Sequence, residues 1–322
     1  ATVIGDTIAR VNERLGRRVT RQNHVGDWGL PIAMVTAKLR TEAQAGRIDL
    51  DKIDLTTLDR LYKAAQAECR GQRQAIAIAE KYDMGPKLLD ELQAKQEEAD
   101  EHLAEAKRTL VALQSGDEAT VELWQRIYNT TMQACLHACA RLNTRITDEH
   151  SAGESSYRSE LAPIVDDLVS RGVATEADGA LVVPLEDAGI KEPCLVRKSD
   201  GGYLYATTDM AGVRRRVQRF EADRLIYCVD ARQSLHFRQV FAAAAKAGYA
   251  TRAGQAEPAA LEHAAFGMVL GDDGKPFKTR SGENVRLSDL LDEAVKSAGD
   301  VVREKNPDLD SSSADAIAEA VG

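Results

Sequence analysis

The chain has 322 residues, of which 43% are hydrophobic and 29% are charged, and its net charge is −9. This composition excludes wholesale disorder and is typical of a soluble globular protein, while the negative charge argues against a surface that wraps nucleic acid as a whole. We expect no membrane span and no signal peptide, and five cysteines in a chain of this length indicate a reducing, cytoplasmic compartment.

The first fifty residues predict part of a nucleotide-binding α/β unit. Apolar residues recur at helical spacing over residues 6–15, and residues 17–22 are expected to form a short strand. A second helix is expected over residues 31–45. Because a helix followed by a strand is the second half of a βαβ unit, we expect the first strand of the sheet to precede Ala1.

Residues 51–150 predict a largely helical insertion. Leucines and alanines form an apolar seam within residues 54–113, which favours an antiparallel helical hairpin with a solvated outer face and no chemistry of its own. A further helix is expected over residues 116–146. Cys135 and Cys139 lie in that helix, and since no second pair of ligands accompanies them, we expect a packed helix face and no metal site.

From residue 151 the pattern changes to alternating helices and strands. The segment 207–220 predicts a helix capped by Thr208 or Asp209, with four inward-facing residues: Met210, Val213, Val217 and Phe220. The other expected elements are a helix and strand within 163–185, a hairpin over 194–209 that turns at Asp200–Gly202, a parallel strand at 223–230, a helix at 234–249, a strand at 262–271 and a helix at 287–306. Such alternation with short links predicts a doubly wound parallel sheet.

This pattern of predicted helices and strands divides the chain into four parts. Residues 1–50 and 151–286 are expected to form the two parts of one catalytic domain, interrupted by the insertion over residues 51–150. Residues 287–322 are expected to form a helix that leads toward a further domain. The fold class is therefore α/β, with the first strand missing from the parallel sheet.

Three loops should meet at the carboxyl edge of this sheet, where open α/β folds bind ligands. They are "NHVGDWG" at 23–29, "VDARQSLH" at 229–236 and "GDDGKPFKTRSG" at 271–282. In the third loop, Lys275, Lys278 and Arg280 suit the phosphates of a nucleotide, although an ordinary basic surface loop is the simpler interpretation of that loop taken alone.

A fourth group of side chains suits a cationic ligand. Tyr205 and Asp209 lie four positions apart at a strand-to-helix junction, and Glu154 lies at another break in the pattern. Two carboxylates and a phenol match a guanidinium, whose planar fork carries five N–H donors. Taken singly, Asp209 is explained as a helix cap and Glu154 as a surface residue.

Five motifs occur in one order along the chain: "NHVGDWG", "GES.Y" at 153–157, "DGGYLYATTD" at 200–209, "D.RQ..H" at 230–236 and "FGMVLG.DGKPFKTR.G" at 266–282. Together they resemble the catalytic region of class I arginyl-tRNA synthetases. The resemblance implies a Rossmann-like class I synthetase domain that activates L-arginine with ATP and Mg²⁺ to arginyl-adenylate and transfers it to tRNA(Arg). It also implies a cytoplasmic, monomeric protein that binds no membrane.

The resemblance also implies roles for individual residues. Those that would hold the arginine side chain are Glu154, Tyr205, Asp209 and Gln233. Those that would contact ATP are His236 near the ribose, the backbone of Met268 and Val269 beside adenine, and Lys278. Lys275, Lys278 and Arg280 would neutralise the departing pyrophosphate, and with His236 they form the expected catalytic set. The loop at 23–29 is expected to be mainly architectural, with the role of His24 left open.

Some parts of the family pattern are absent from the sequence. There is no His-x-Gly-His signature, no anticodon-binding domain and no N-terminal tRNA-elbow domain. The simplest interpretation is a synthetase fragment, in which case these 322 residues alone should not aminoacylate tRNA. One alternative is a synthetase-like protein that has lost catalysis and binds arginine or nucleotide. Another is a helical scaffold whose residues 54–113 bind a partner.

Overall fold

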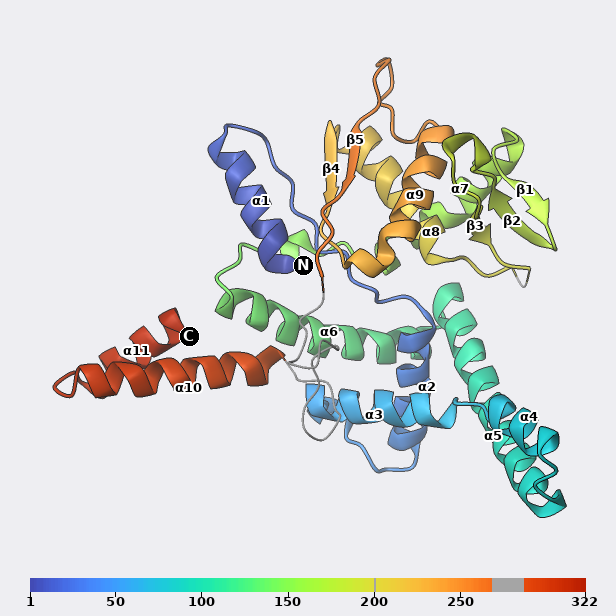
Figure 1. Cartoon of the computed structure of the whole chain (residues 1–322), viewed down its shortest axis with the longest axis horizontal. Helices are drawn as coiled ribbons and strands as arrows, with labels where there is room; N and C mark the ends of the chain where they lie inside the picture. The colour runs from blue at the N-terminus through green and yellow to red at the C-terminus, as the bar shows by residue number, and fades with distance from the viewer. Residues whose placement is uncertain (200, 268–286) are drawn as a thin grey trace. The chain divides into compact units, whose positions relative to one another are not determined.

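The computed structural model describes residues 1–199, 201–267 and 287–322. These residues fall into two compact units (Figure 1). The larger unit holds residues 2–228 and 233–264, and the smaller holds Ala1, residues 229–232 and the chain from residue 265 onward.

The larger unit contains most of the regular structure. Its α-helices are α1 (Thr2–Arg14), α2 (Leu30–Gln44), α3 (Leu55–Glu68), α4 (Arg73–Lys81), α5 (Pro86–Ser115), α6 (Glu118–Arg141), α7 (Arg158–Ser170), α8 (Tyr205–Arg214) and α9 (Ser234–Lys246). Its strands are β1 (Thr175–Ala177), β2 (Ala180–Val183), β3 (Cys194–Arg197), β4 (Arg224–Tyr227) and β5 (Ala260–His263). Short 3₁₀ turns include η1 (Leu50–Lys52), η2 (Asp148–His150), η3 (Glu154–Tyr157) and η4 (Glu186–Ala188), and a π-helical turn, η5 (Arg215–Arg219), extends α8.

The smaller unit contains the 3₁₀ turn η6 (Ala231–Gln233), whose last residue belongs to the larger unit, and two helices. These helices are α10 (Leu287–Lys305) and α11 (Ser311–Val321). Arg303 of α10 forms an ion pair with Asp315 of α11 at 2.5 Å. Among the helices of the described residues, none is long and apolar enough to cross a membrane.

The segment after α1 is extended but forms no strand, so the strand predicted over residues 17–22 is wrong. Arg21 in this segment donates to Asp6 of α1 at 3.0 Å and also pairs with Glu13 of the same helix. These ion pairs hold the segment against its own helix instead of against a strand. Asn23, the next residue along the chain, makes an isolated parallel bridge with Ser151.

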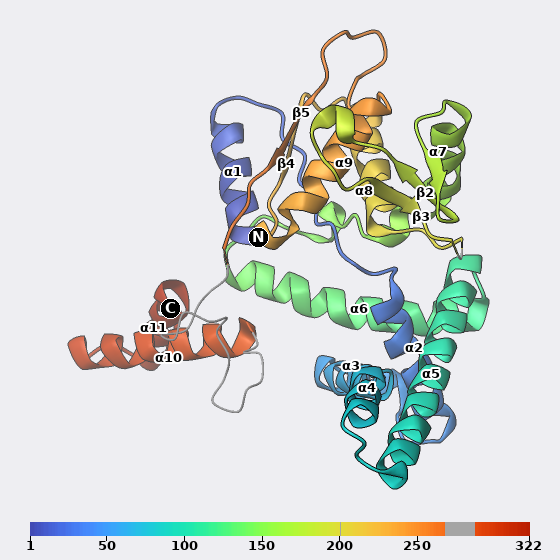
Figure 2. The same cartoon turned by 45° about the vertical axis from the view of Figure 1, so that its right-hand side comes forward.

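The insertion is helical, as predicted, but residues 54–113 fall into three helices instead of a two-helix hairpin. The helical structure is interrupted between α3 and α4 and again at Gly85, whose φ of +90° is a conformation that favours glycine. Figures 1 and 2 both show α4 lying beside α5. The predicted seam is buried at Ala99, Ala106 and Leu113. A second core joins α2, α3 and α6 around Val35, Leu39, Leu58, Leu61 and Ile127.

Among the described regular strands, β4 and β5 form a parallel pair. They pair in register from Arg224 with Ala260 to Tyr227 with His263, and α9 connects them. Both cartoon views show the two strands side by side (Figure 2). Strands β1, β2 and β3 form a separate antiparallel sheet in chain order. The predicted hairpin keeps its turn at Gly201, where φ is +84°, but its second arm is a single bridge at Tyr203.

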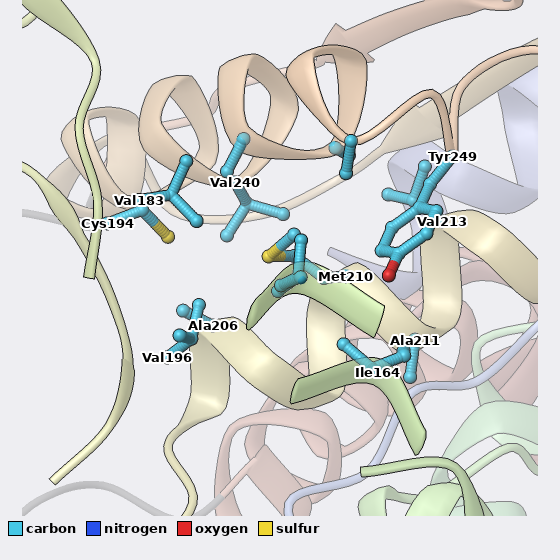
Figure 3. Packing of buried hydrophobic residues seen from close by; sticks show 14 of the residues in the cluster. Ile164, Val183, Cys194, Val196, Ala206, Met210, Ala211, Val213, Val240 and Tyr249 are labelled. Atoms are coloured by element: carbon cyan, nitrogen blue, oxygen red, sulfur yellow. The ribbon is translucent and has the colours of Figure 1, made fainter. Parts of the chain in front are cut away.

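The main hydrophobic core lies between α7, α8, α9 and the antiparallel sheet. In Figure 3, Met210 of α8 lies between Val240 of α9 and Ile164 of α7. Met210, Val213 and Val217 are buried as predicted. Phe220 is 36% exposed, so its predicted inward position is wrong. The π-helical turn η5 adds a residue to the helical repeat and thereby rotates Phe220 away from the core.

Helix α8 begins at Tyr205, earlier than the sequence predicts. Neither Thr208 nor Asp209 is therefore its cap, and both side chains are buried within the helix. Thr207 instead anchors the start of α8, because its hydroxyl donates to the carbonyl of Val196 in β3. Because α8 starts early, Asp209 lies inside the helix, and its carboxylate can contact side chains of other segments.

Candidate active site

The loop at 23–29 is fastened to the turn η3 by its acidic residue. Asp27 accepts the backbone N–H of Ser155 at 2.9 Å and the Ser155 hydroxyl at 2.7 Å. The Trp124 indole N–H donates to the carbonyl of Asp27 at 2.8 Å. The rings of Trp124 and Trp28 lie edge to face, with 5.2 Å between their centroids. Gly153 is required beside this carboxylate, because a Cβ there would lie 2.5 Å from Asp27 Oδ2. These contacts support the expected architectural role of the loop.

Glu154, which begins η3, is a buried carboxylate in an acidic environment. Its side chain is 9% exposed, and its backbone N–H donates to the carbonyl of Val25 at 3.0 Å. Burial, together with the negative charges of Asp27 and Asp209, raises the pKa of Glu154 to about 7. An unneutralised carboxylate of this kind favours the binding of a cation.

Asp209 lies between two histidines from distant parts of the chain. His236, in the first turn of α9, places Nε2 at 2.7 Å from Asp209 Oδ2. His24, in the loop at 23–29, places Nε2 at 3.6 Å from Asp209 Oδ1. The sequence expectation that His236 faces ATP did not include this contact. His236 lies within hydrogen-bond distance of the carboxylate, whereas His24, at 3.6 Å, forms an ion pair with it only when the imidazole is protonated.

Tyr205 and Gln233 are more exposed than these carboxylates. The Tyr205 hydroxyl oxygen would lie 3.2 Å from a Cβ at Gly29, so the phenol lies against the loop at 23–29. Partial burial and the charge of Glu154 raise the pKa of Tyr205. Gln233 lies exposed at the end of η6, three residues before His236. The structure thus brings Glu154, Tyr205 and Asp209 into one electrostatic environment, and Gln233 lies at the exposed start of the helix that carries His236.

Sequence reasoning missed Arg216, which lies in η5. Its guanidinium donates to the Tyr227 hydroxyl at 2.7 Å and to the Tyr157 hydroxyl at 3.3 Å. It also donates to the side-chain oxygen of Gln22 and lies 3.4 Å from Nδ1 of His24. In the sequence, Arg216 belongs to a run of three arginines that reads as solvated charge. The only available signal was the apolar spacing on either side of it.

Five of the residues predicted from the sequence lie outside the described residues. They are Met268, Val269, Lys275, Lys278 and Arg280. In the part of the chain that the structure does describe, no group of three or more His, Cys, Asp or Glu side chains could hold a metal ion. The described site therefore consists of two buried carboxylates, two histidines and a phenol.

Such an arrangement can bind a planar cation. The charge of Asp209 helps to raise the pKa of the buried Glu154 carboxyl. A guanidinium can donate to two carboxylates at once through its fork of N–H groups, whereas an ammonium is a compact charge. The positive charge of such a ligand would offset the repulsion that neighbouring carboxylates exert on Glu154.

Comparison with known proteins shows the family of the chain. The family described as "tRNA synthetases class I (R), catalytic domain" matches residues 1–322. The chain belongs to this arginyl-tRNA synthetase family. Among its relatives, the arginine–tRNA ligase of Shewanella oneidensis is 40% identical and that of Laribacter hongkongensis 41% identical, each over 326 residues. These alignments cover 100% of this chain and 50% and 51% of the relatives, so the chain spans about half the length of the curated relatives it matches.

Solved structures of arginyl-tRNA synthetases share the fold of this family member. The enzyme from Plasmodium falciparum superimposes with a TM-score of 0.70 at 24% identity, covering 99% of this chain and 46% of that one. The enzyme from Thermus thermophilus gives a TM-score of 0.67 at 23% identity, covering 99% and 52%. The predicted fold class, an α/β class I synthetase domain with a helical insertion, is confirmed.

Proposed function

We propose that this chain carries the arginine-activating site of an arginine–tRNA ligase. In the first step, a carboxylate oxygen of L-arginine attacks the α-phosphorus of ATP, and the bond to the β-phosphate breaks as pyrophosphate leaves. In the second step, a terminal ribose hydroxyl of tRNA(Arg) attacks the carbonyl carbon of arginyl-adenylate, and AMP leaves. The family membership of the whole chain supports this reaction.

The electrostatic effect of Asp209 on the buried carboxyl of Glu154 is the observation that carries the proposal. Both carboxylates are buried, and the charge of Asp209 helps to raise the pKa of Glu154. A buried carboxylate whose pKa is raised by other carboxylates favours a ligand that brings a positive charge and several N–H donors. The arginine side chain meets both requirements. In our proposal Tyr205 and Gln233 complete the pocket at its more exposed side.

Some of the residues proposed to contact ATP lie in the part of the chain that the structure describes, and others lie outside it. His236 follows the parallel strand β4 and begins α9, the position in open α/β folds at which ligands bind. We propose that it lies near the ribose. The backbone of Met268 and Val269 would face adenine, and the cationic side chains of Lys275, Lys278 and Arg280 would stabilise the negative charge that develops on pyrophosphate. Mg²⁺ bound with ATP would supply further charge stabilisation.

The proposal is tested by arginine-dependent exchange of pyrophosphate into ATP, measured with and without tRNA(Arg). The protein is expressed from its gene as wild type, as Asp209→Ala and as Asp166→Ala, which removes an exposed carboxylate of α7. We expect exchange in the wild type and in the α7 control, and at least a hundredfold loss in Asp209→Ala. Exchange that does not depend on arginine contradicts the proposal. Calorimetric binding of arginine without exchange would instead support a synthetase-like protein that has lost catalysis.

A further inference from the structure

Two consecutive arginines of η5 contact η3, the turn that begins with Glu154. Arg215 donates to the carbonyl of Ser156 at 2.6 Å and to its hydroxyl at 3.1 Å. The guanidinium of Arg215 also lies over the ring of Tyr157, 3.8 Å from the centroid. Arg216 donates to the hydroxyl of the same tyrosine at 3.3 Å. Adjacent residues of one helical turn thus contact both the face and the hydroxyl of Tyr157, which is fully buried.

Both guanidiniums are also held by segments other than η3. Arg215 forms an ion pair with Glu160 of α7 at 2.6 Å. Arg216 donates to the hydroxyl of Tyr227 in β4 at 2.7 Å and to the side-chain oxygen of Gln22. Because these partners fix the two cations from other directions, the cations can in turn fix the turn that they contact.

The first half of η3 is fastened on its other side by the loop at 23–29. The backbone N–H and the hydroxyl of Ser155 both donate to Asp27. The carboxylate of Glu154 lies against the same loop, since a Cβ at Gly26 would lie 3.6 Å from Glu154 Oε1. The loop therefore holds the first half of η3, and the two arginines hold the second half.

The helix that contains the two arginines also carries Asp209. Residues 205–219 form α8 and its π-helical continuation η5, with Asp209 one and a half turns before Arg215. The contacts of η5 with η3 therefore act on the position of Glu154 relative to Asp209. A guanidinium can donate to two carboxylates at once only where their separation matches its planar fork. π-helical turns are frequent at functional sites.

We propose that Arg215 and Arg216 are positioning residues for Glu154: they hold η3 against the helix of Asp209 and so fix the separation of the two carboxylates that receive the guanidinium. In this proposal, which rests on the proposed function of the site, neither arginine touches the substrate. The consequence is selectivity, because a fixed pair of carboxylates favours a forked guanidinium over the compact ammonium of lysine.

Kinetics of arginine-dependent pyrophosphate exchange separate positioning from folding in the protein expressed from its gene. We expect Arg215→Met, which removes the donors to Ser156, to raise the arginine KM roughly tenfold while the KM for ATP stays within about twofold. Loss of folded protein alone would lower the maximal rate and leave both KM values unchanged. The control is Arg214→Met, which removes the preceding arginine; that residue lies 3.7 Å from Glu160 and 5.4 Å from the ring of Tyr249. An arginine KM that is unchanged in Arg215→Met, or raised equally in Arg214→Met, overturns the proposal.

Tyr157→Phe is a milder variant that removes the hydroxyl contacted by Arg216 and keeps the ring. We expect it to raise the arginine KM about threefold. In both Tyr157→Phe and Arg215→Met, the ratio of the calorimetric affinities for arginine and lysine should fall. A ratio that stays at the wild-type value in both variants contradicts the role in selectivity.

Amide hydrogen exchange of the ligand-free protein tests the contacts without any substrate. Arg215→Met should raise the exchange rate of the amides at 154–157 roughly tenfold, and Arg214→Met should leave it unchanged. An unchanged rate in Arg215→Met overturns the inference. If the wild type shows no arginine-dependent exchange of pyrophosphate, the proposed function fails, and this measurement still decides whether the two arginines hold η3.

Discussion

Replacing Glu154 by glutamine should stabilise the protein and weaken its binding of arginine at the same time. Glu154 has 9% of its surface exposed and a pKa raised from 4.5 to about 7 by burial and by two neighbouring carboxylates. A pKa change of that size means that folding disfavours the ionised form of Glu154 by about 3 kcal/mol relative to the protonated form. Glutamine has nearly the same shape and carries no charge, so Glu154→Gln removes this cost wherever the wild-type residue is ionised.

The sign of the effect depends on pH. Because the folded-state pKa of Glu154 is raised, the stability it contributes is fully present below about pH 4.5 and is lost as the pH rises through about 7. The variant should therefore match the wild type at pH 4.5 and exceed its free energy of unfolding by about 3 kcal/mol at pH 8.

Urea unfolding of the ligand-free protein measures this difference. Trp28 and Trp124, the two tryptophans of the chain, lie beside the site and report its unfolding by fluorescence. Glu149→Gln, which replaces an exposed carboxylate of η2, serves as the control and should show no such dependence on pH. A variant no more stable than the wild type at pH 8, or equally stabilised at both pH values, would refute the reasoning.

Three further predictions concern the same site. Calorimetric affinity for arginine should increase up to about tenfold per pH unit between pH 5.5 and 7 and level off near pH 8, because Glu154 must lose its proton to pair with the guanidinium; affinity that is flat over this range would argue against the pairing. In exchange kinetics, Asp209→Ala should raise the arginine KM at least a hundredfold and Tyr205→Phe roughly tenfold or less, since an unpaired charge costs more than a lost neutral hydrogen bond. Gly153→Ala should lower the free energy of unfolding by about 1–3 kcal/mol, because its Cβ would displace Asp27 from its hydrogen bonds; urea unfolding with an unchanged midpoint would disprove the steric argument.

Local patterns predicted much of the fold. The inward face of α8 was predicted at Met210, Val213 and Val217 because helical spacing brings apolar residues onto one stripe. The parallel strand β4 and the helix α9 after it were predicted from a short apolar run followed by a helical one. The spacing of Glu154 and Asp209 in the sequence does not show that the two residues lie in one site. The resemblance to the synthetase family is what allowed both to be proposed as ligands of one arginine side chain.

The remaining features depend on contacts between distant segments. Arg216 is fixed by Gln22, which lies 194 positions away, and no local pattern reports such a partner. The segment after α1 has the composition of a strand, but Arg21 pairs with the acidic residues of its own helix. Phe220 follows the apolar spacing of α8 and still lies outside the core, because a π-helical turn changes the repeat.

In the proposed site, Glu154 and Asp209 together bind a guanidinium. Calorimetry of the wild-type protein at pH 8 with arginine and with citrulline tests it most directly, since citrulline keeps the length of arginine but carries a neutral urea group. We expect one arginine site per chain and binding of citrulline that is at least a hundredfold weaker. Citrulline that binds as tightly as arginine would contradict it.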